Sequence, residues 1–227
     1  MDTPRVASRA EWLVARKALL ARENELSRQR DALSAERRKL PIVRIEKEYV
    51  FEGGNGRASL RDLFEGRRRL IVYHFQFDPG WDEDCGSCSH LADSFAGGIV
   101  HLPARDTSFA AVSRAPIAKI ESCKRRMGWT FPWLSSLGSD FNDDFRVTLD
   151  GPAGGVDTTG ELPGLSVFLR DGDDVFHTYS TYQRALDVLL GTYNSLDLTP
   201  RDRPAEDGRT PASLRRHDRY PALQARR

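Results

Sequence analysis

The sequence lacks the cysteines of a disulfide-rich protein, a long apolar run and an excess of either charge. Its 227 residues include three cysteines, an odd number and too few to staple a secreted scaffold. No stretch approaches the roughly 18 apolar residues that cross a bilayer, and the N-terminus has no signal-peptide core. With 34 Lys and Arg against 33 Asp and Glu, the net charge of +1 gives no overall attraction to nucleic acid or an acidic membrane. We therefore expect a cytoplasmic protein with no nucleic-acid or membrane partner and no cofactor.

Composition divides the chain into three parts. In residues 1–40, a capping box from Ser8 to Glu11 precedes a stretch without Gly or Pro, which predicts a long helix. Its apolar residues recur every seven positions, at Trp12, Leu19, Leu26, Leu33 and Leu40. We expect this helix to lie against its own domain or a partner subunit, and a homodimer through it is one form this can take. Residues 41–199 form the main domain, and residues 200–227, rich in Pro, Arg, Asp and Gly, are expected to be a disordered tail.

The main domain alternates predicted strands and helices. Continuous apolar residues predict buried strands at 70–75 and 109–112, and alternating ones predict a half-buried strand at 43–51. Residues 116–127 are expected to form a helix, and 150–164 a glycine-rich loop. A β-hairpin is predicted at 166–179, followed by a helix with an apolar stripe at Leu186, Leu189, Leu190 and Tyr193. This rhythm predicts an α/β fold with a central mixed sheet flanked by helices.

The most informative feature is a C-G-S-C between a predicted buried strand and a predicted helix. This context is the thioredoxin-like arrangement. Amide groups at a helix N-terminus favour a thiolate, and the spacing lets the second thiol attack a mixed disulfide formed by the first. The pattern predicts that Cys85 is the nucleophile and Cys88 the resolving thiol in exchange with a disulfide-containing protein or small thiol substrate. The alternative is that the two cysteines form a structural or vestigial pair without redox chemistry.

A series of motifs in fixed order resembles a known family. They are W-D-E-D-C-G-S-C-S-H-L-A-D (81–93), A-V-S-R-A-P (111–116), R-M-G-W-T-F-P-W (126–133), G-S-D-F-N (138–142) and V-F-H-T-Y-S-T-Y (175–182). Together they resemble DUF899, a family of bacterial thioredoxin-like proteins, over residues 9–200. The resemblance implies a thioredoxin-like fold, here with an added N-terminal helix, and thiol chemistry.

The sequence departs from thioredoxins and peroxiredoxins at several positions. Ser87 stands where thioredoxins have Pro, and the acidic residues 82–84 are expected to disfavour a thiolate and make Cys85 less acidic than the fold suggests. Pro163 is the nearest candidate for the cis-proline that faces the cysteines in thioredoxins. Asp82 replaces the Thr of the peroxiredoxin motif, which disfavours a peroxiredoxin-type peroxidase.

A second hypothesis is a binding protein without redox turnover. Cys85 and Cys88 could hold copper or zinc together with a histidine such as His74 or His177. A tetrahedral zinc site lacks obvious ligands, since no second C-x-x-C is present. Docking of a partner protein on the N-terminal helix is the other form of this hypothesis.

Besides Pro163, two side chains could line the dithiol, and the third cysteine is expected to lie apart from it. His74, at the end of the central strand, could hydrogen-bond or exchange protons with a thiol, although a histidine bonded within the sheet explains it as well. Trp81, four residues before Cys85, could cover the site, or simply pack. Cys123 shares a helical face with apolar residues and is expected to be a buried core thiol.

Overall fold

The structure is a computed structural model that describes residues 5–145, 147–149, 160–200 and 215–220. The chain divides into two compact units, Met1–Pro41 and Ile42–Arg227. The first unit consists of helix α1 (Arg9–Arg37), and its predicted capping box is confirmed. The amide of Glu11 donates to the Ser8 hydroxyl at 3.3 Å, and the Glu11 carboxylate accepts from the Ser8 amide at 2.9 Å. The heptad side chains of α1 are about half exposed.

The second unit is built on an eight-stranded mixed sheet in the order β1-β10-β9-β4-β5-β6-β2-β3. Its strands are β1 (Val43–Arg44), β2 (Val50–Gly53), β3 (Gly56–Ser59), β4 (Arg69–His74), β5 (Thr107–Ser113), β6 (Trp133–Ser135), β9 (Gly164–Asp171) and β10 (Asp174–Tyr182). A separate ribbon pairs β7 (Thr148–Leu149) with β8 (Gly160–Glu161). The α-helices are α2 (Gly86–Ala96), α3 (Ile117–Met127), α4 (Phe141–Asp144) and α5 (Gly191–Leu196), and 3-10 turns are η1 (Asp62–Phe64), η2 (Ile99–His101), η3 (Pro103–Arg105), η4 (Gln183–Leu189) and η5 (His217–Arg219).

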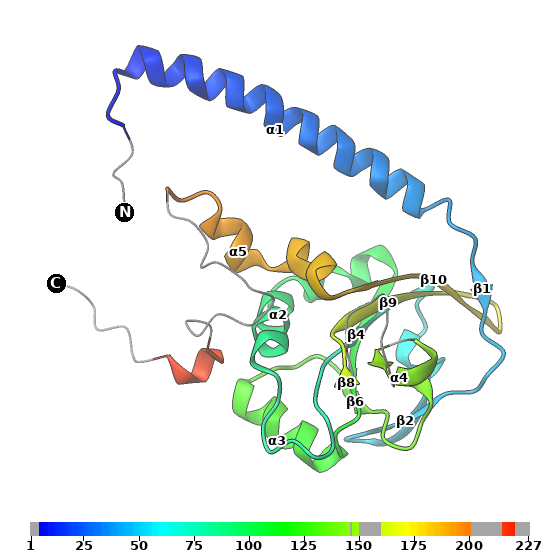
Figure 1. The fold of residues 1–227 in the computed structure, drawn as a ribbon. Helices are drawn as coiled ribbons and strands as arrows, with labels where there is room; N and C mark the ends of the chain where they lie inside the picture. Colours follow the sequence, from blue (N-terminus) through cyan, green and yellow to red (C-terminus); the bar gives the residue numbers. More distant parts are fainter. Residues whose placement is uncertain (1–4, 146, 150–159, 201–214, 221–227) are drawn as a thin grey trace. The chain divides into compact units, whose positions relative to one another are not determined.

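The centre of the sheet has the predicted thioredoxin-like topology. Strand β4 pairs in parallel with β5 and antiparallel with β9, and β9 forms a hairpin with β10. Helix α2 lies in the connection from β4 to β5, so a β-α-β unit is followed by a β-β-α unit that ends in η4 and α5. Figure 1 shows this central part of the sheet beside α2 and α3. The expected fold class is therefore confirmed.

Side chains of the central strands alternate between two cores, one on each face of the sheet. Tyr73 and Phe75 pack with residues of α2 and α3, on the face that we call the cysteine face because Cys88 belongs to this core. Leu70 and Val72 point the other way and pack with aromatic residues of η1 and α4. In Figure 1, α2 and α3 lie on one side of the sheet and α4 on the other.

Two local predictions are wrong for topological reasons. The single strand predicted at 43–51 is two strands, because β1 pairs with β10 at one edge of the sheet whereas β2 pairs with β6 near the other edge. After the hairpin, residues 183–189 form a 3-10 turn instead of the first part of an α-helix. The changed spacing leaves Leu189 exposed, while Leu186, Leu190 and Tyr193 are buried.

The predicted disordered tail contains a segment with a defined place. Residues 215–220 include η5 and make ion pairs with the loop before α2. The rest of the predicted tail, 201–214 and 221–227, and most of the predicted glycine-rich loop, 150–159, lie outside the described residues. Within the part of the chain that the structure describes, no helix combines the length and the apolar character needed to cross a bilayer.

Candidate dithiol site

The C-G-S-C lies where the sequence predicts it, between the end of β4 and the start of α2. Cys85 is the N-cap residue of α2, in an extended backbone conformation, and its sulfur accepts from the Cys88 amide at 3.5 Å. The free amides of a first helical turn carry partial positive charge, and an anion at the N-cap position is stabilised by them. The local fold therefore places the sulfur of Cys85 where a thiolate is favoured.

The thiol of Cys85 is partly exposed and acidic. Its pKa is lowered to about 6, first by a hydrogen bond from the Cys88 thiol and then by the Ser87 hydroxyl and the amides of both residues, against an opposing effect of burial. Ser87 Oγ lies 3.1 Å from Cys85 Sγ. At neutral pH a thiol with this pKa is mostly thiolate, the reactive form.

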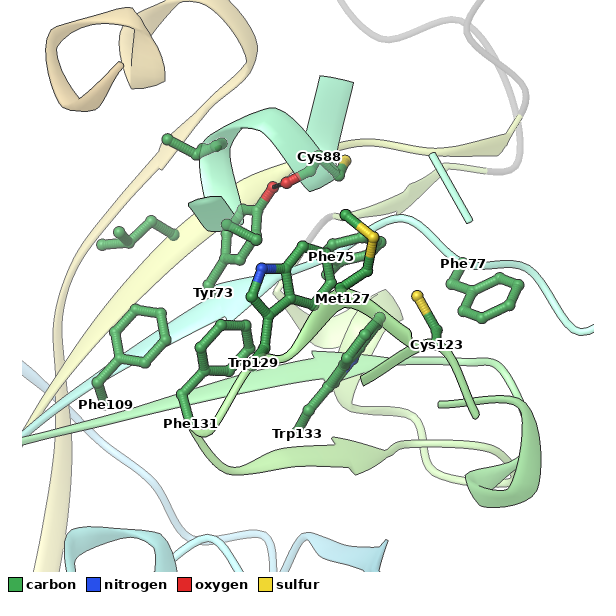
Figure 2. Close-up of a cluster of buried hydrophobic side chains, with 14 of the residues drawn as sticks. Tyr73, Phe75, Phe77, Cys88, Phe109, Cys123, Met127, Trp129, Phe131 and Trp133 are labelled. Atoms are coloured by element: carbon green, nitrogen blue, oxygen red, sulfur yellow. Dashed lines mark hydrogen bonds between the residues drawn. The ribbon is translucent and has the colours of Figure 1, made fainter. Parts of the chain in front are cut away.

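The second thiol of the pair is protected and weakly acidic. The residue Cys88 is 1% exposed, and burial raises the pKa of its thiol well above the ordinary value. The Tyr73 hydroxyl, on the cysteine face of β4, donates to the Cys88 carbonyl at 3.2 Å, the bond drawn in Figure 2. The two thiols therefore differ strongly in acidity and access, and the cysteines 85, 88 and 123 are all free.

Gln76 is a site residue that sequence reasoning missed. Its side-chain oxygen lies 3.4 Å from Cys85 Sγ and 3.5 Å from Cys88 Sγ, in position to accept from either thiol. It lies two residues after the end of β4, in the loop that leads to α2. The loop leaving the carboxyl end of a central strand is the usual place for functional residues in such sheets, and this is the signal that could have found it.

The expectation that the acidic residues 82–84 make Cys85 less acidic is wrong. The residue Asp84 is 4% exposed, and its carboxylate accepts from Arg126 at 2.9 Å and from Arg216 at 3.0 Å. Glu83 pairs with Arg216 and Arg219. Arginine charges compensate the carboxylates nearest the thiol, so the donors of the first turn set its pKa.

Comparison with known proteins identifies the family. Residues 1–220 match the family described as "Bacterial protein of unknown function (DUF899)". The chain belongs to this family. No curated protein matches this DUF899 chain.

Several solved structures are similar to this DUF899 protein in part. Peroxiredoxin Q of Xanthomonas campestris is 15% identical, with a TM-score of 0.48, over 64% of this chain and 89% of its own. Peroxidoxin BcpB of Mycobacterium tuberculosis is 16% identical, with a TM-score of 0.46, over 69% of this chain and 96% of its own. Thioredoxin peroxidase I of Plasmodium yoelii is 12% identical, with a TM-score of 0.45, over 70% of this chain and 88% of its own.

In this DUF899 chain, His74 does not line the dithiol. Because side chains alternate along a strand, its ring points to the face opposite Tyr73 and Phe75, where it stacks on Phe141 with ring centres 5.5 Å apart. Its Nε2 is 2.8 Å from Ser166 Oγ, and burial lowers the pKa of His74 to about 3. Of the two interpretations of His74, the structure therefore supports a neutral histidine that is hydrogen-bonded within the sheet.

His177 belongs to the same hydrogen-bonded chain as His74. Its Nε2 is 2.7 Å from Ser180 Oγ, and Ser180 Oγ is 2.8 Å from Ser166 Oγ. Both histidines are thus joined to each other through two serines instead of facing the cysteines. Among the described residues, no group of three or more His, Cys, Asp or Glu side chains could hold a metal ion. The metal-binding hypothesis therefore finds no assembled ligand set with Cys85 and Cys88 in the part of the chain described.

Of the other two predicted lining residues, one lies in the loop between β4 and α2 and the other just before β9. Trp81 is 40% exposed, in the loop before Cys85, and its carbonyl accepts from Lys119 at 2.9 Å. Pro163 immediately precedes β9, whose first residue, Gly164, pairs with His74 at the carboxyl end of β4. The described residues contain no cis peptide bond, so Pro163 is not a cis-proline in this structure. The predicted core thiol Cys123 is confirmed as buried.

Proposed function

We propose that this protein is a thiol-disulfide oxidoreductase in which Cys85 is the nucleophile and Cys88 the resolving thiol. The observation that carries the proposal is the asymmetry of the pair. Cys85 is accessible and its pKa is about 6, whereas Cys88 is buried with a pKa far above the ordinary value. A structural pair of thiols has no need for an acidic, accessible member.

The proposed reaction follows from these positions. The Cys85 thiolate attacks one sulfur of a disulfide, a new S–S bond forms to Cys85, and the other half of the substrate leaves as a thiolate. Cys88 then loses its proton to solvent or to the leaving thiolate and attacks Cys85 Sγ. The second half of the substrate leaves, and two electrons have passed from the dithiol to the substrate. Run backwards, the same steps oxidise a dithiol substrate.

The second step is assisted by the loss of charge in the first. Burial is the main cause of the raised pKa of Cys88, and the neighbouring Cys85 sulfur raises it further. Once Cys85 is in a mixed disulfide, its sulfur carries no negative charge. The pKa of Cys88 then falls, and its sulfur becomes a better nucleophile at the moment it is needed.

The test is a redox titration of the full chain against glutathione or dithiothreitol, read by thiol trapping and mass. We expect a reversible two-electron couple within roughly −270 to −120 mV, the range of known thiol oxidoreductases. Cys123→Ser, which alters a cysteine outside the pair, should titrate like the wild type, whereas Cys85→Ser and Cys88→Ser should show no couple. Full disulfide-reducing activity in Cys85→Ser, or no bond between Cys85 and Cys88 at any potential, would refute the proposal.

A further inference from the structure

A segment far along the chain completes the surroundings of the dithiol. Arg216, just before η5, donates through Nε to both carboxylate oxygens of Asp84 at 3.0 Å. Its guanidinium also donates to the Asp84 carbonyl. The side chains of Arg216 and Asp84 are 12% and 2% exposed. The contact is therefore a buried, multiply bonded ion pair between residues that lie 132 positions apart.

A buried carboxylate at the position of Asp84 is unfavourable both for folding and for ionisation of Cys85. A buried carboxylate needs partners, and this one directly precedes the residue whose thiolate would do the chemistry. Arg126 of α3 supplies one guanidinium at 2.9 Å, and the Ser89 hydroxyl of α2 also donates to the carboxylate. Arg126 also pairs with Asp218, and Arg216 and Arg219 both pair with Glu83, so three arginines balance three carboxylates in this cluster. Without Arg216, the cluster beside Cys85 would carry a net negative charge.

We propose that Arg216 is a positioning residue of the dithiol site, which acts through Asp84 to keep the thiol of Cys85 ionised and the entry into α2 fixed. Its consequence for exchange rests on the proposed function, but its effect on the thiol does not. The guanidinium compensates the buried carboxylate, and its bond to the Asp84 carbonyl holds the peptide group that leads into the N-cap.

The remaining charged and titratable groups around Cys85 do not replace this contribution. Cys88 lies on the same helix, and the buried phenol of Tyr73 faces the pair from β4. Asp218 of the same segment pairs with Arg126 at 2.8 Å, and the other ion pairs of residues 215–220 lie further out. Arg219 pairs with exposed Glu83, and His217 Nδ1 is 2.7 Å from Asp93 Oδ1 at the surface. Exposed pairs of this kind contribute little. They offer a matched control in the same segment.

The experiment measures the pKa of Cys85 in the full chain, from thiolate absorbance at 240 nm and from the pH dependence of iodoacetamide alkylation. Arg216→Gln should raise this pKa by about one pH unit, the lower end of the shift produced by a nearby charge. Arg216→Lys keeps the charge and should restore most of the difference. Arg219→Gln removes an arginine from the same segment and should leave the pKa unchanged.

A double variant separates the effect of the Arg216 charge on the pKa of Cys85 from a general disturbance of the structure. Adding Asp84→Asn to Arg216→Gln removes the carboxylate that was left with one arginine, so the pKa of Cys85 should return toward the wild-type value. A folded Arg216→Gln protein with an unchanged pKa would overturn the inference. If Arg216→Gln does not fold, Asp84→Asn alone decides, because a raised pKa of Cys85 in that variant contradicts the assigned role. Shifted pKa values without any disulfide exchange would refute the proposed function and support this inference.

Discussion

The hydroxyl of Ser87 offers the sharpest test of why Cys85 is acidic. Ser87 Oγ lies 3.1 Å from Cys85 Sγ, and its hydrogen bond is among the causes that lower the pKa of this thiol to about 6. A hydrogen bond to a charged group is worth about 1.5–3 kcal/mol, and each pH unit corresponds to about 1.4 kcal/mol. Ser87→Ala should therefore raise the pKa of Cys85 by at least about one unit.

The expected consequences at pH 7 follow directly. A thiol with a pKa of about 6 is about 90% ionised, whereas one with a pKa of about 7 is about 50% ionised. The reduced protein loses about 1 kcal/mol of thiolate stabilisation, so its potential becomes about 20 mV more negative. The sign is fixed, because a thiolate stabilises the reduced form and its loss makes the disulfide a weaker oxidant.

The assay is the alkylation rate of the reduced protein between pH 4 and 10, with the potential measured in glutathione buffers. Ser94→Ala is the matched control, since Ser94 lies on the same helix but its hydroxyl donates to the His90 carbonyl. It should leave the alkylation midpoint near pH 6. If Ser87→Ala titrates like the wild type, the assignment of the acidity to side-chain donors is wrong.

Two further predictions concern parts of the molecule outside the dithiol. The pKa of buried His74 is about 3, against about 6.5 when unfolded, so its neutral form stabilises the fold fully above pH 6.5. That contribution is lost as the pH falls from 6.5 toward 3, by at most about 5 kcal/mol, and urea unfolding of His74→Phe should show a weaker pH dependence over this range. An equal slope in both proteins would contradict this. We also expect the heptad residues of α1 to pair two chains, so that Leu26→Glu gives a monomer by light scattering where the wild type is a dimer. A monomeric wild type would rule this out.

Much of the fold could be predicted from local sequence patterns. The capping box from Ser8 to Glu11 lies within three residues of sequence, and so do the donors that surround a C-x-x-C at a helix start. The apolar run that predicts β4 is equally local. These features depend on neighbouring residues, and their physics is the same in any chain that contains them.

Two features could not be predicted from the sequence: the face of the sheet that a side chain occupies, and contacts between residues far apart in the chain. The run that forms β4 is apolar on both faces, so it carries no sign of which face His74 takes, and only the positions of α2 and α4 decide. The acidity of Cys85 was misjudged for a related reason. The carboxylate of Asp84 is visible beside it in the sequence, whereas the two arginines that compensate it lie 42 and 132 residues further along.

That separation has a consequence for biosynthesis. Bacterial chains grow at about 5–20 residues per second, so Arg216 is added roughly 7–26 s after Asp84. During that interval the nascent chain can already form β4 and α2, but the buried carboxylate has only Arg126 and Ser89 for partners. The proposed role of Arg216 then implies that the Cys85 thiol is less acidic, and so less reactive, before Arg216 has joined the growing chain.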